Sequence, residues 1–327
     1  MNYNVLIIGA GRIGAFFDTP HDHRVLTHAH AFSKHPAFEL VGFVDADSAA
    51  AADAAQRWGG RAFVSIEQAF LQSAIDIVCV ATPDSTHYDI LKQLLRYSIK
   101  LVFAEKPLTK TLEQAGHIKQ LYEQAGIPVL VNYSRRFVPD FHKLRERVQH
   151  GDFGRFVTGT GYYGKGLLHN GSHMLDFMRF FLGEMSAVKS VQKIFDYYDD
   201  DPSIVGTVHF EHYDAPFFLQ PVDCRLFTIF EIDLLFEKGR LRILNSGFTI
   251  EEYAVERSVI FQGYSNLVLK HQYSSSLDQA LYYAADNSAQ FLVGRQPLYC
   301  TLDDALIVMK FCEQDDSHAK KNTSVCS

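Results

Sequence analysis

A glycine-rich segment is the first place where residue types and spacing point to a chemical role. Gly9-Ala10-Gly11-Arg12-Ile13-Gly14 directly follows an apolar run and opens a helical stretch. In such a turn the glycines allow a tight bend, a close approach of the backbone to a diphosphate and close packing of helix on strand. Because the turn lies within a strand–helix–strand series, it predicts a dinucleotide site rather than a simple glycine-rich turn. The residues expected to contact this cofactor are Gly9, Gly11, Arg12, Ile13 and Gly14.

Asp45 ends the second expected strand, where a carboxylate can bind the hydroxyl groups of the adenosine ribose. A carboxylate there repels a 2′-phosphate, and no arginine follows directly, so NAD is favoured over NADP. The alternative interpretation is a turn residue at the end of a strand. Asp45 lies farther from Gly14 than the usual span of about 20 residues. A loop from Phe17 to Leu26, inserted after the first turn of helix, would explain the excess.

Five of the 15 histidines are expected to fall in this inserted loop. A metal site would need three or four imidazoles on converging rigid elements, with Asp18 or Asp22 as the only carboxylates at hand. We expect no metal, and a solvated loop near the cofactor, acting as a lid, is the preferred interpretation. The histidines are His21, His23, His28, His30 and His35.

Four later motifs, in this order, resemble the signatures of the glucose-fructose oxidoreductase, inositol dehydrogenase and rhizopine catabolism family, often called Gfo/Idh/MocA. They are Ala-Thr-Pro-Asp-Ser-Thr-His at 81–87, Glu-Lys-Pro at 105–107, Asn-Tyr-Ser-Arg-Arg-Phe at 132–137 and Gly-Ser-His-Met-Leu-Asp at 171–176. Two further pieces, at 237–241 and 290–297, extend the similarity almost end to end. The resemblance implies an NAD(P)-dependent oxidoreductase of sugars, cyclitols or nucleotide sugars that uses a lysine and a histidine instead of a catalytic metal.

The resemblance also implies which residues act at the reacting carbon. Lys106 and His173 match the family's catalytic lysine and histidine, and Asp176 lies one helical turn after His173, where it can orient the imidazole. The alternatives are a solvated loop lysine and a core histidine with its hydrogen bonds satisfied. Strand ends at residues 81–83 and 105–107 are expected to border the nicotinamide half of the cofactor. The residues assigned there are Thr82, Pro83, His87, Glu105 and Lys106.

Two positions depart from the family pattern of Gly-Gly, three residues, Asp, three residues, His. Lys165 replaces the second glycine, and His169 replaces the aspartate four residues before His173. An imidazole at 169 cannot supply that negative charge, so His169 could itself be the base, with His173 as support.

Positive charge near this segment suits a substrate that carries a carboxylate or phosphate, such as a sugar acid or a nucleotide-activated sugar. Pairing of these charges at the surface is the alternative. The residues expected to bind substrate are Lys106, Tyr133, Arg135, Arg136, Lys165, His169 and His173.

The order of elements predicts an α/β fold with two domains. Up to residue 131, short β-rich runs alternate with helical patterns, as in an N-terminal Rossmann dinucleotide-binding domain. From residue 132, consecutive β-rich runs predict an α+β domain, for substrate binding and oligomerisation, with a large, mainly antiparallel open sheet. The expected strands are 4–8, 40–44, 77–80, 100–103 and 128–131, then 187–195, 204–210, 217–219, 225–236, 239–243, 248–252 and 258–262. The expected helices are 49–58, 66–72, 87–95, 112–124, 139–149, 172–182, 277–293 and 302–314, and residues 315–327 are expected to fray.

Composition excludes several classes of function. With 31 basic against 38 acidic residues and no basic block, the chain offers little grip on nucleic acid. No apolar stretch approaches the 18 or so residues that span a bilayer, and no basic segment precedes the first apolar run, so we expect a cytoplasmic protein. The five scattered cysteines read as reduced thiols.

Three questions stay open at this point. An apolar outer face on the second sheet would favour a homodimer or homotetramer. A first alternative function, suggested by the family, is an NAD-dependent glycoside hydrolase or eliminase that works through transient oxidation. A second is a non-catalytic NAD-sensing protein.

Overall fold

The computed structural model describes residues 2–314, so the expected fraying at 315–327 lies outside the described residues. The chain divides into two compact units. The first contains the residues up to Val138 together with Asp278–Ile307, and the second contains Pro139–Leu277 and the chain from Val308. The expected boundary after residue 131 differs from this division. The reason lies in the segment after 131, where Arg136 donates to a carboxylate oxygen of Asp304 at 3.0 Å and so joins the first unit.

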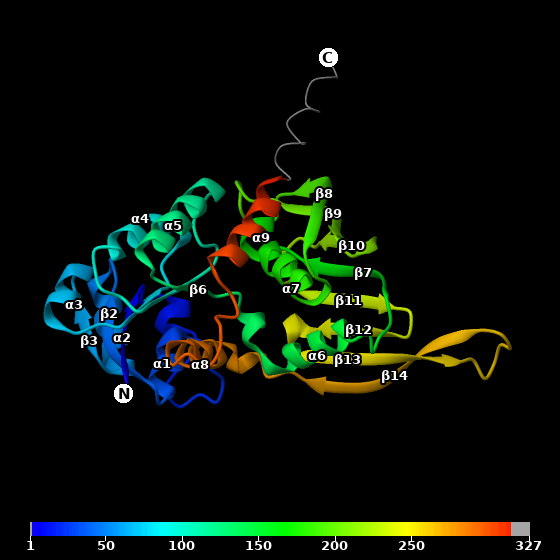
Figure 1. The fold of residues 1–327 in the computed structure, drawn as a ribbon, viewed down its shortest axis with the longest axis horizontal. Coiled ribbons are helices and arrows are strands. Elements are labelled where there is room, and N and C mark those ends of the chain that lie inside the picture. The colour runs from blue at the N-terminus through cyan, green and yellow to red at the C-terminus, as the bar shows by residue number, and fades with distance from the viewer. Residues whose placement is uncertain (1, 315–327) are drawn as a thin grey trace, which may run out of the picture. The chain divides into compact units, whose positions relative to one another are not determined.

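The first unit is a six-stranded parallel sheet with strand order β3-β2-β1-β4-β5-β6, which confirms the Rossmann-like prediction. Figure 1 shows α4 and α5 on one side of this sheet and α1 and α8 on the other. The strands are β1 (Tyr3–Ile8), β2 (Phe38–Val44), β3 (Arg61–Phe63), β4 (Ile77–Val80), β5 (Leu101–Ala104) and β6 (Val129–Val131). The helices are η1 (Arg12–Phe16), α1 (His28–Lys34), α2 (Ser48–Trp58), α3 (Ile66–Gln72), α4 (Asp84–Leu94), α5 (Leu112–Ala125), η2 (Ser134–Phe137) and α8 (Ala280–Leu292).

The central strands form because their residues are apolar throughout and covered by helices on both faces. Every residue of β4 and β5 is buried, and the expected ranges for these strands were correct to within one residue. Strand β3 was not predicted. It has only three residues, two of them exposed, so no hydrophobic pattern marks it.

The inserted segment after η1 is confirmed as a loop, but its histidines were assigned wrongly. His28 and His30 lie on helix α1 and His35 ends it, and all three are buried, whereas His21 and His23 are exposed as expected. The burial is possible because each buried imidazole has a polar partner. His30 Nδ1, for example, lies 2.8 Å from a carboxylate oxygen of Asp18.

The second unit is an eight-stranded sheet with order β14-β13-β12-β11-β7-β10-β9-β8. Only β7 and β10 pair in parallel, so the prediction of a mainly antiparallel sheet is confirmed. The strands are β7 (Phe156–Tyr163), β8 (Met185–Ile194), β9 (Ser203–Phe210), β10 (Tyr213–Pro221), β11 (Glu231–Phe236), β12 (Gly239–Leu244), β13 (Thr249–Arg257) and β14 (Ser265–Ser274). The helices are α6 (Pro139–Gln149), η3 (Gly166–Gly171), α7 (Ser172–Leu182) and η4 (Asn245–Gly247), and α9 (Leu302–Gln314) ends the described chain.

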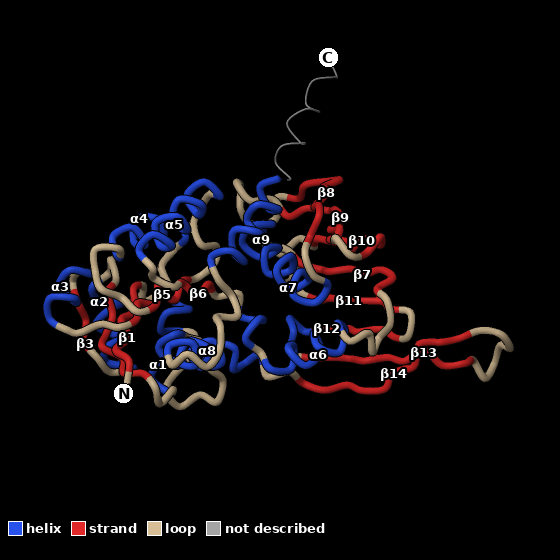
Figure 2. Tube along the Cα trace, in the orientation of Figure 1, coloured by secondary structure: helices blue, strands red, loops and turns tan. Residues whose placement is uncertain are grey.

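Two strands of this sheet were missed. Strand β7 contains Gly159 and Gly161, which weaken the β pattern in the sequence. The structure explains these glycines, because a Cβ at Gly161 would lie 2.6 Å from the sulfur of Met174 on α7. Strand β14 was also missed, and the strand expected at 258–262 is instead the turn that joins β13 to β14. Figure 2 shows β13 and β14 extending beyond the rest of their sheet as a two-stranded hairpin.

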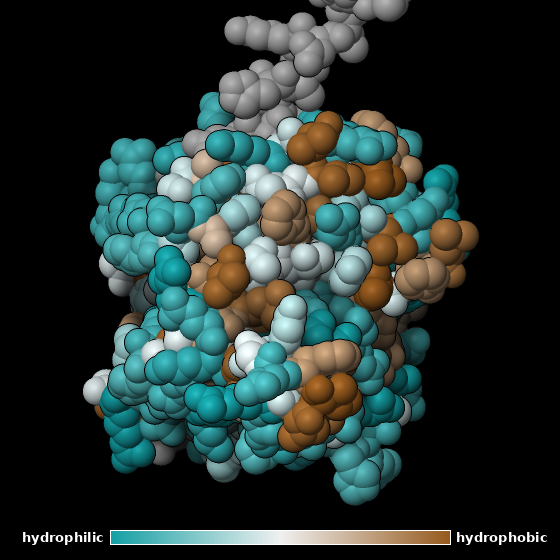
Figure 3. Space-filling model, turned by 90° about the vertical axis from the view of Figure 1, so that its right-hand side faces the viewer, coloured by the Kyte–Doolittle hydropathy of each residue, from teal (hydrophilic) through white to brown (hydrophobic). Residues whose placement is uncertain are grey.

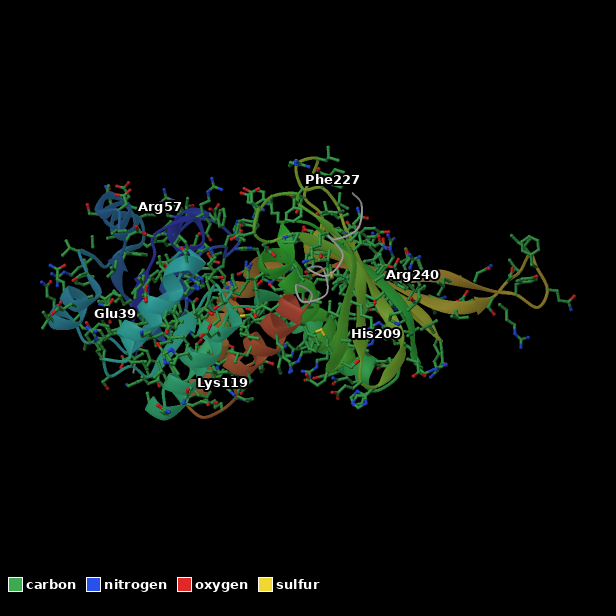
Figure 4. All side chains as sticks on the ribbon, turned by 90° about the horizontal axis from the view of Figure 1, so that it is seen from above. Glu39, Arg57, Lys119, His209, Phe227 and Arg240 are labelled. Atoms are coloured by element: carbon green, nitrogen blue, oxygen red, sulfur yellow. The ribbon has the colours of Figure 1, made fainter. Side chains whose placement is uncertain are left out.

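The outer face of the second sheet is mixed in character. Val157, Val191 and Phe218 are exposed on β7, β8 and β10. On β11 and β12, Asp233 is paired with Arg240, which is labelled in Figure 4. Figure 3 likewise shows separate hydrophobic patches among hydrophilic side chains on the face that it presents. The apolar outer face on which the oligomer prediction depended is therefore discontinuous.

The part of the chain from residue 2 to residue 314 contains no helix with the length and apolar character needed to cross a membrane.

Candidate functional site

The glycine-rich turn has one open glycine and two that are enclosed by backbone. Gly9 has φ +100°, and a Cβ there would lie 2.6 Å from the carbonyl of Ala81. A Cβ at Gly14 would lie 2.1 Å from the carbonyl oxygen of Gly9. A Cβ at Gly11, in contrast, would meet no atom within 4 Å. The turn thus packs tightly against the sheet while leaving the backbone at Gly11 open to a ligand, which is the arrangement that a diphosphate needs.

Asp45 lies directly against this turn. Its Oδ2 accepts a hydrogen bond from the backbone N–H of Ala10 at 2.6 Å, and its Oδ1 accepts one from Asp47 at 2.9 Å. The carboxylate is half-buried and fixed beside the open glycine. The structure therefore brings together the two features that the sequence singled out for a dinucleotide, 35 residues apart in the chain. These residues fit an NAD-type cofactor, because a fixed carboxylate can accept hydrogen bonds from ribose hydroxyls.

The expected nicotinamide-side residues lie on two neighbouring loops that His87 links. Its Nδ1 lies 3.0 Å from the carbonyl oxygen of Pro107, and its Nε2 lies 2.8 Å from that of Thr82. The ring is 1% exposed. His87 therefore holds the ends of β4 and β5 together, whereas Thr82 is half-buried and Pro83 is exposed.

A buried polar cluster surrounds Glu105, the residue that precedes Lys106. Glu105 accepts a hydrogen bond from Asn132 at 2.7 Å and pairs with His28 Nε2 at 2.8 Å. Burial disfavours both charges, yet Cys79 and Glu105 raise the pKa of His28 to about 10, and His28 and Asn132 lower the pKa of Glu105. The contact between His28 and Glu105 was not predicted, since no local spacing connects two residues 77 positions apart.

Of the expected substrate-binding residues in the first unit, the structure favours Lys106 and Arg135 over Tyr133 and Arg136. Lys106 and Arg135 are half-buried, whereas Tyr133 is 1% exposed. Arg136 is 6% exposed and its guanidinium donates to Asp304 at 3.0 Å and to the carbonyl oxygen of Tyr299 at 3.3 Å. Arg136 therefore joins η2 to the start of α9.

In the second unit, the remaining candidates lie along one short stretch of chain. Lys165 has φ +65°, the left-handed region in which side chains are rare, so the departure from glycine is strained at this position. His169 lies on η3, and His173 is the second residue of α7. His173 is half-buried, and Asp176, one turn later, is 1% exposed.

His169 has a carboxylate partner that the sequence analysis missed. Its Nδ1 lies 2.6 Å from Oδ2 of Asp201, which comes from the segment between β8 and β9.

Within residues 2–314, no group of three or more histidine, cysteine, aspartate or glutamate side chains is arranged to hold a metal ion.

Comparison with known proteins agrees with this geometry. A family model described as "Oxidoreductase family, NAD-binding Rossmann fold", GFO_IDH_MocA, matches residues 3–133. An inositol 2-dehydrogenase of Corynebacterium glutamicum (strain R) is 30% identical over 159 residues, which cover 48% of this chain and 44% of that protein. The chain spans about half the length of the curated relatives that it matches.

Solved structures extend the likeness of fold to nearly the whole chain. A myo-inositol dehydrogenase from Corynebacterium glutamicum ATCC 13032 has 18% identity and a TM-score of 0.75, with 98% of this chain and 97% of that chain covered. A super-repressor mutant of Gal80p from Saccharomyces cerevisiae has 15% identity and a TM-score of 0.77, with 97% and 96% covered. The resemblance seen in the motifs is confirmed for residues 3–133, which match the model of the Gfo/Idh/MocA oxidoreductase family.

Proposed function

We propose that this protein is a dehydrogenase or reductase that transfers a hydride between NAD and a secondary alcohol or ketone carbon of a sugar-like substrate. The observation that carries the proposal is the open backbone at Gly11 beside a carboxylate, Asp45, that is fixed on the N–H of Ala10 at 2.6 Å. The match of residues 3–133 to the model of an oxidoreductase family supports the reaction class. The inositol 2-dehydrogenases among the relatives support a polyol or sugar as the substrate class.

The preference for NAD over NADP follows from charge. A fixed carboxylate accepts hydrogen bonds from two ribose hydroxyls but repels a 2′-phosphate. Gly9, Gly11 and Gly14 with the N–H groups of their turn would hold the diphosphate, and Asp45 would hold the ribose. When bound, the nicotinamide supplies the hydride acceptor or donor.

The residues of the chain would supply the proton chemistry. In the oxidation direction, the substrate hydroxyl loses its proton as the hydride leaves the same carbon, so a base must lie near that oxygen. Lys106 is a cation that stabilises negative charge developing on the oxygen, and His173 is the base candidate, with His169 as the alternative. Asp176, one helical turn after His173, would orient the ring. An anionic group on the substrate would suit Lys165 and Arg135, and this stays a prediction, as do the cytoplasmic location and the homo-oligomer.

The test is a panel of myo-inositol, scyllo-inositol, aldoses, sugar acids and nucleotide sugars, assayed with NAD at the absorbance of NADH. We expect net NADH formation with at least one polyol or sugar. Cleavage of a glycoside without net NADH would instead identify a hydrolase that works through transient oxidation. Tight NAD binding with no turnover across the panel would instead favour a non-catalytic sensor, since a super-repressor mutant of Gal80p shares the fold.

A further inference from the structure

The segment Asp196–Asp201, which joins β8 to β9, reads Asp-Tyr-Tyr-Asp-Asp-Asp and lies against the turn at Lys165–Gly171. Its two end carboxylates hold the backbone of that turn. Asp196 accepts from the N–H of Lys165 at 2.7 Å, and Asp201 accepts from the N–H groups of Leu168 and His169, each at 2.9 Å. Both aspartates are almost fully buried. The turn that carries His169 is therefore fixed from outside by two charged hydrogen bond acceptors.

The aromatic residues of the segment contact the two side chains that distinguish the turn. The ring of Tyr198 stacks on the imidazole of His169 with centroids 4.0 Å apart and planes 18° apart. The ammonium of Lys165 lies 5.2 Å from the centroid of Tyr197. The position of the His169 ring is thus determined by packing as well as by hydrogen bonds.

The third contact of Asp201 is with the imidazole itself. Its Oδ2 lies 2.6 Å from Nδ1 of His169, and the side chain of Asp201 is 9% exposed while that of His169 is 22% exposed. An ionised carboxylate only accepts hydrogen bonds, so the proton of the neutral ring must lie on Nδ1. The lone pair is then on Nε2, which is the nitrogen that can accept a proton.

The backbone at Gly166 leaves room for the carboxylate of Asp201. Gly166 has φ +77°, and a Cβ there would lie 2.0 Å from Oδ2 of Asp201. Glycine at 166 therefore provides the space that lets the carboxylate reach both the backbone and the ring.

We infer that Asp201 is a positioning residue that makes His169 the proton acceptor of the reaction. This inference rests on the proposed function for its chemistry. As the hydride moves from the substrate carbon to the nicotinamide, the hydroxyl proton passes to Nε2 of His169, and the product is a ketone, NADH and an imidazolium. Asp201 keeps its charge throughout and stabilises the imidazolium through Nδ1–H. His173 then acts in support, and the reverse reaction returns the same proton.

The first test needs no activity. Nitrogen-15 NMR of the histidine rings, at a pH where His169 is neutral, reports which ring nitrogen carries the proton, and His169→Gln identifies the resonances. We expect the Nδ1–H form in the wild-type protein. The Nε2–H form, or an even mixture of the two, would overturn the inference whatever the enzyme does.

The second test compares two equal changes of charge on the same segment. Asp201→Asn places an amide N–H against Nδ1 of His169, which moves the ring proton to Nε2. The lone pair on Nε2 that would accept the substrate proton is then lost. Asp196→Asn is the matched control, because it makes the same change at a carboxylate that holds the backbone and does not contact the imidazole. We expect Asp201→Asn to lower kcat by 10²-fold or more with KM within threefold of wild type, and Asp196→Asn to keep kcat within threefold.

The outcomes separate the inference from the proposed function. If no substrate in the panel is turned over, the proposed function fails, and the ring proton measured by NMR in the wild type and in Asp201→Asn still decides the role of Asp201. If Asp201→Asn and Asp196→Asn lower kcat equally, the role of Asp201 is structural and the inference is wrong. If Asp201→Asn does not fold, the wild-type spectrum alone decides.

Discussion

Replacing single glycines in the dinucleotide turn should separate binding from folding. Alanine at Gly11 would adopt φ −79° and ψ −161°, an ordinary extended conformation, and its methyl group would meet no atom within 4 Å. Its free energy of unfolding should therefore stay within about 1 kcal/mol of wild type, on the stabilising side, because alanine restricts the unfolded chain. Alanine at Gly14 would lie 2.1 Å from the carbonyl oxygen of Gly9, more than an ångström too close. We expect that variant to lose about 1–3 kcal/mol.

Gly11→Ala, which should fold normally, is nevertheless expected to bind the cofactor more weakly. The methyl group of Gly11→Ala would occupy the space in front of the backbone, where the diphosphate would approach. We expect its affinity for NAD to fall at least tenfold, which corresponds to about 1.4 kcal/mol. Gly116→Ala is the matched control, since Gly116 lies on α5 and a Cβ there also meets nothing within 4 Å. That variant should bind NAD as the wild type does.

The assays are urea unfolding and isothermal titration calorimetry with NAD, on the full chain. Two results would refute the reasoning. If Gly11→Ala binds NAD with wild-type affinity, the open face of this turn is not the diphosphate site. If Gly11→Ala is as unstable as Gly14→Ala, the space at Gly11 is not open in solution.

Three further predictions concern charge. The wild-type protein should bind NAD at least tenfold more tightly than NADP, about 1.4 kcal/mol, and Asp45→Ser should remove the difference in dissociation constants, whereas equal affinities in the wild type would exclude the ribose role of Asp45. His28→Gln should cost about 3 kcal/mol of unfolding free energy at pH 6, because it leaves the buried charge of Glu105 without its partner. Since the pKa of His28 is raised from 6.5 to about 10, this contribution is complete below pH 6.5 and is lost as the pH rises toward 10; a gap between wild type and variant that does not shrink in urea unfolding at pH 9.5 would contradict the ion pair. Lys106→Ala and His173→Ala should each lower turnover about 10²-fold or more with little change in NAD affinity, because Lys106 stabilises charge on the reacting oxygen and His173 supports His169; near-full turnover in His173→Ala would show that His169 works without His173.

Much of the fold could be predicted from the sequence, because continuous apolar runs and helical periodicity are local signals. Helices α3, α6, α7 and α9 have the expected bounds to the residue. The failures are places where tertiary contacts override the local pattern. Strand β7 carries glycines because helix α7 packs closely on it, and α1 carries histidines because each has a buried partner elsewhere in the chain.

The candidate functional site could likewise be predicted only in part. The glycine turn and Asp45 could be predicted because their spacing is a motif, and the structure brings them together at 2.6 Å. The buried partners of His169 and Glu105 could not be predicted. Asp201 is 32 residues from His169, and His28 is 77 residues from Glu105, so no sequence spacing connects either pair.

The division of the chain has a consequence for biosynthesis. The first unit is interrupted, since Asp278–Ile307 returns to it after Pro139–Leu277 of the second unit has been made. Until then the backbone N–H of Val25 lacks the carbonyl of Asp278, which accepts it at 2.8 Å, and the buried Arg136 lacks Asp304. Domains usually fold in order from the N-terminus as the ribosome releases them. Here the first unit would be completed only after most of the second unit has been made, so a nascent chain or a truncation that ends at Val138 would leave the guanidinium of Arg136 without Asp304 and would expose the face of α1 that α8 covers.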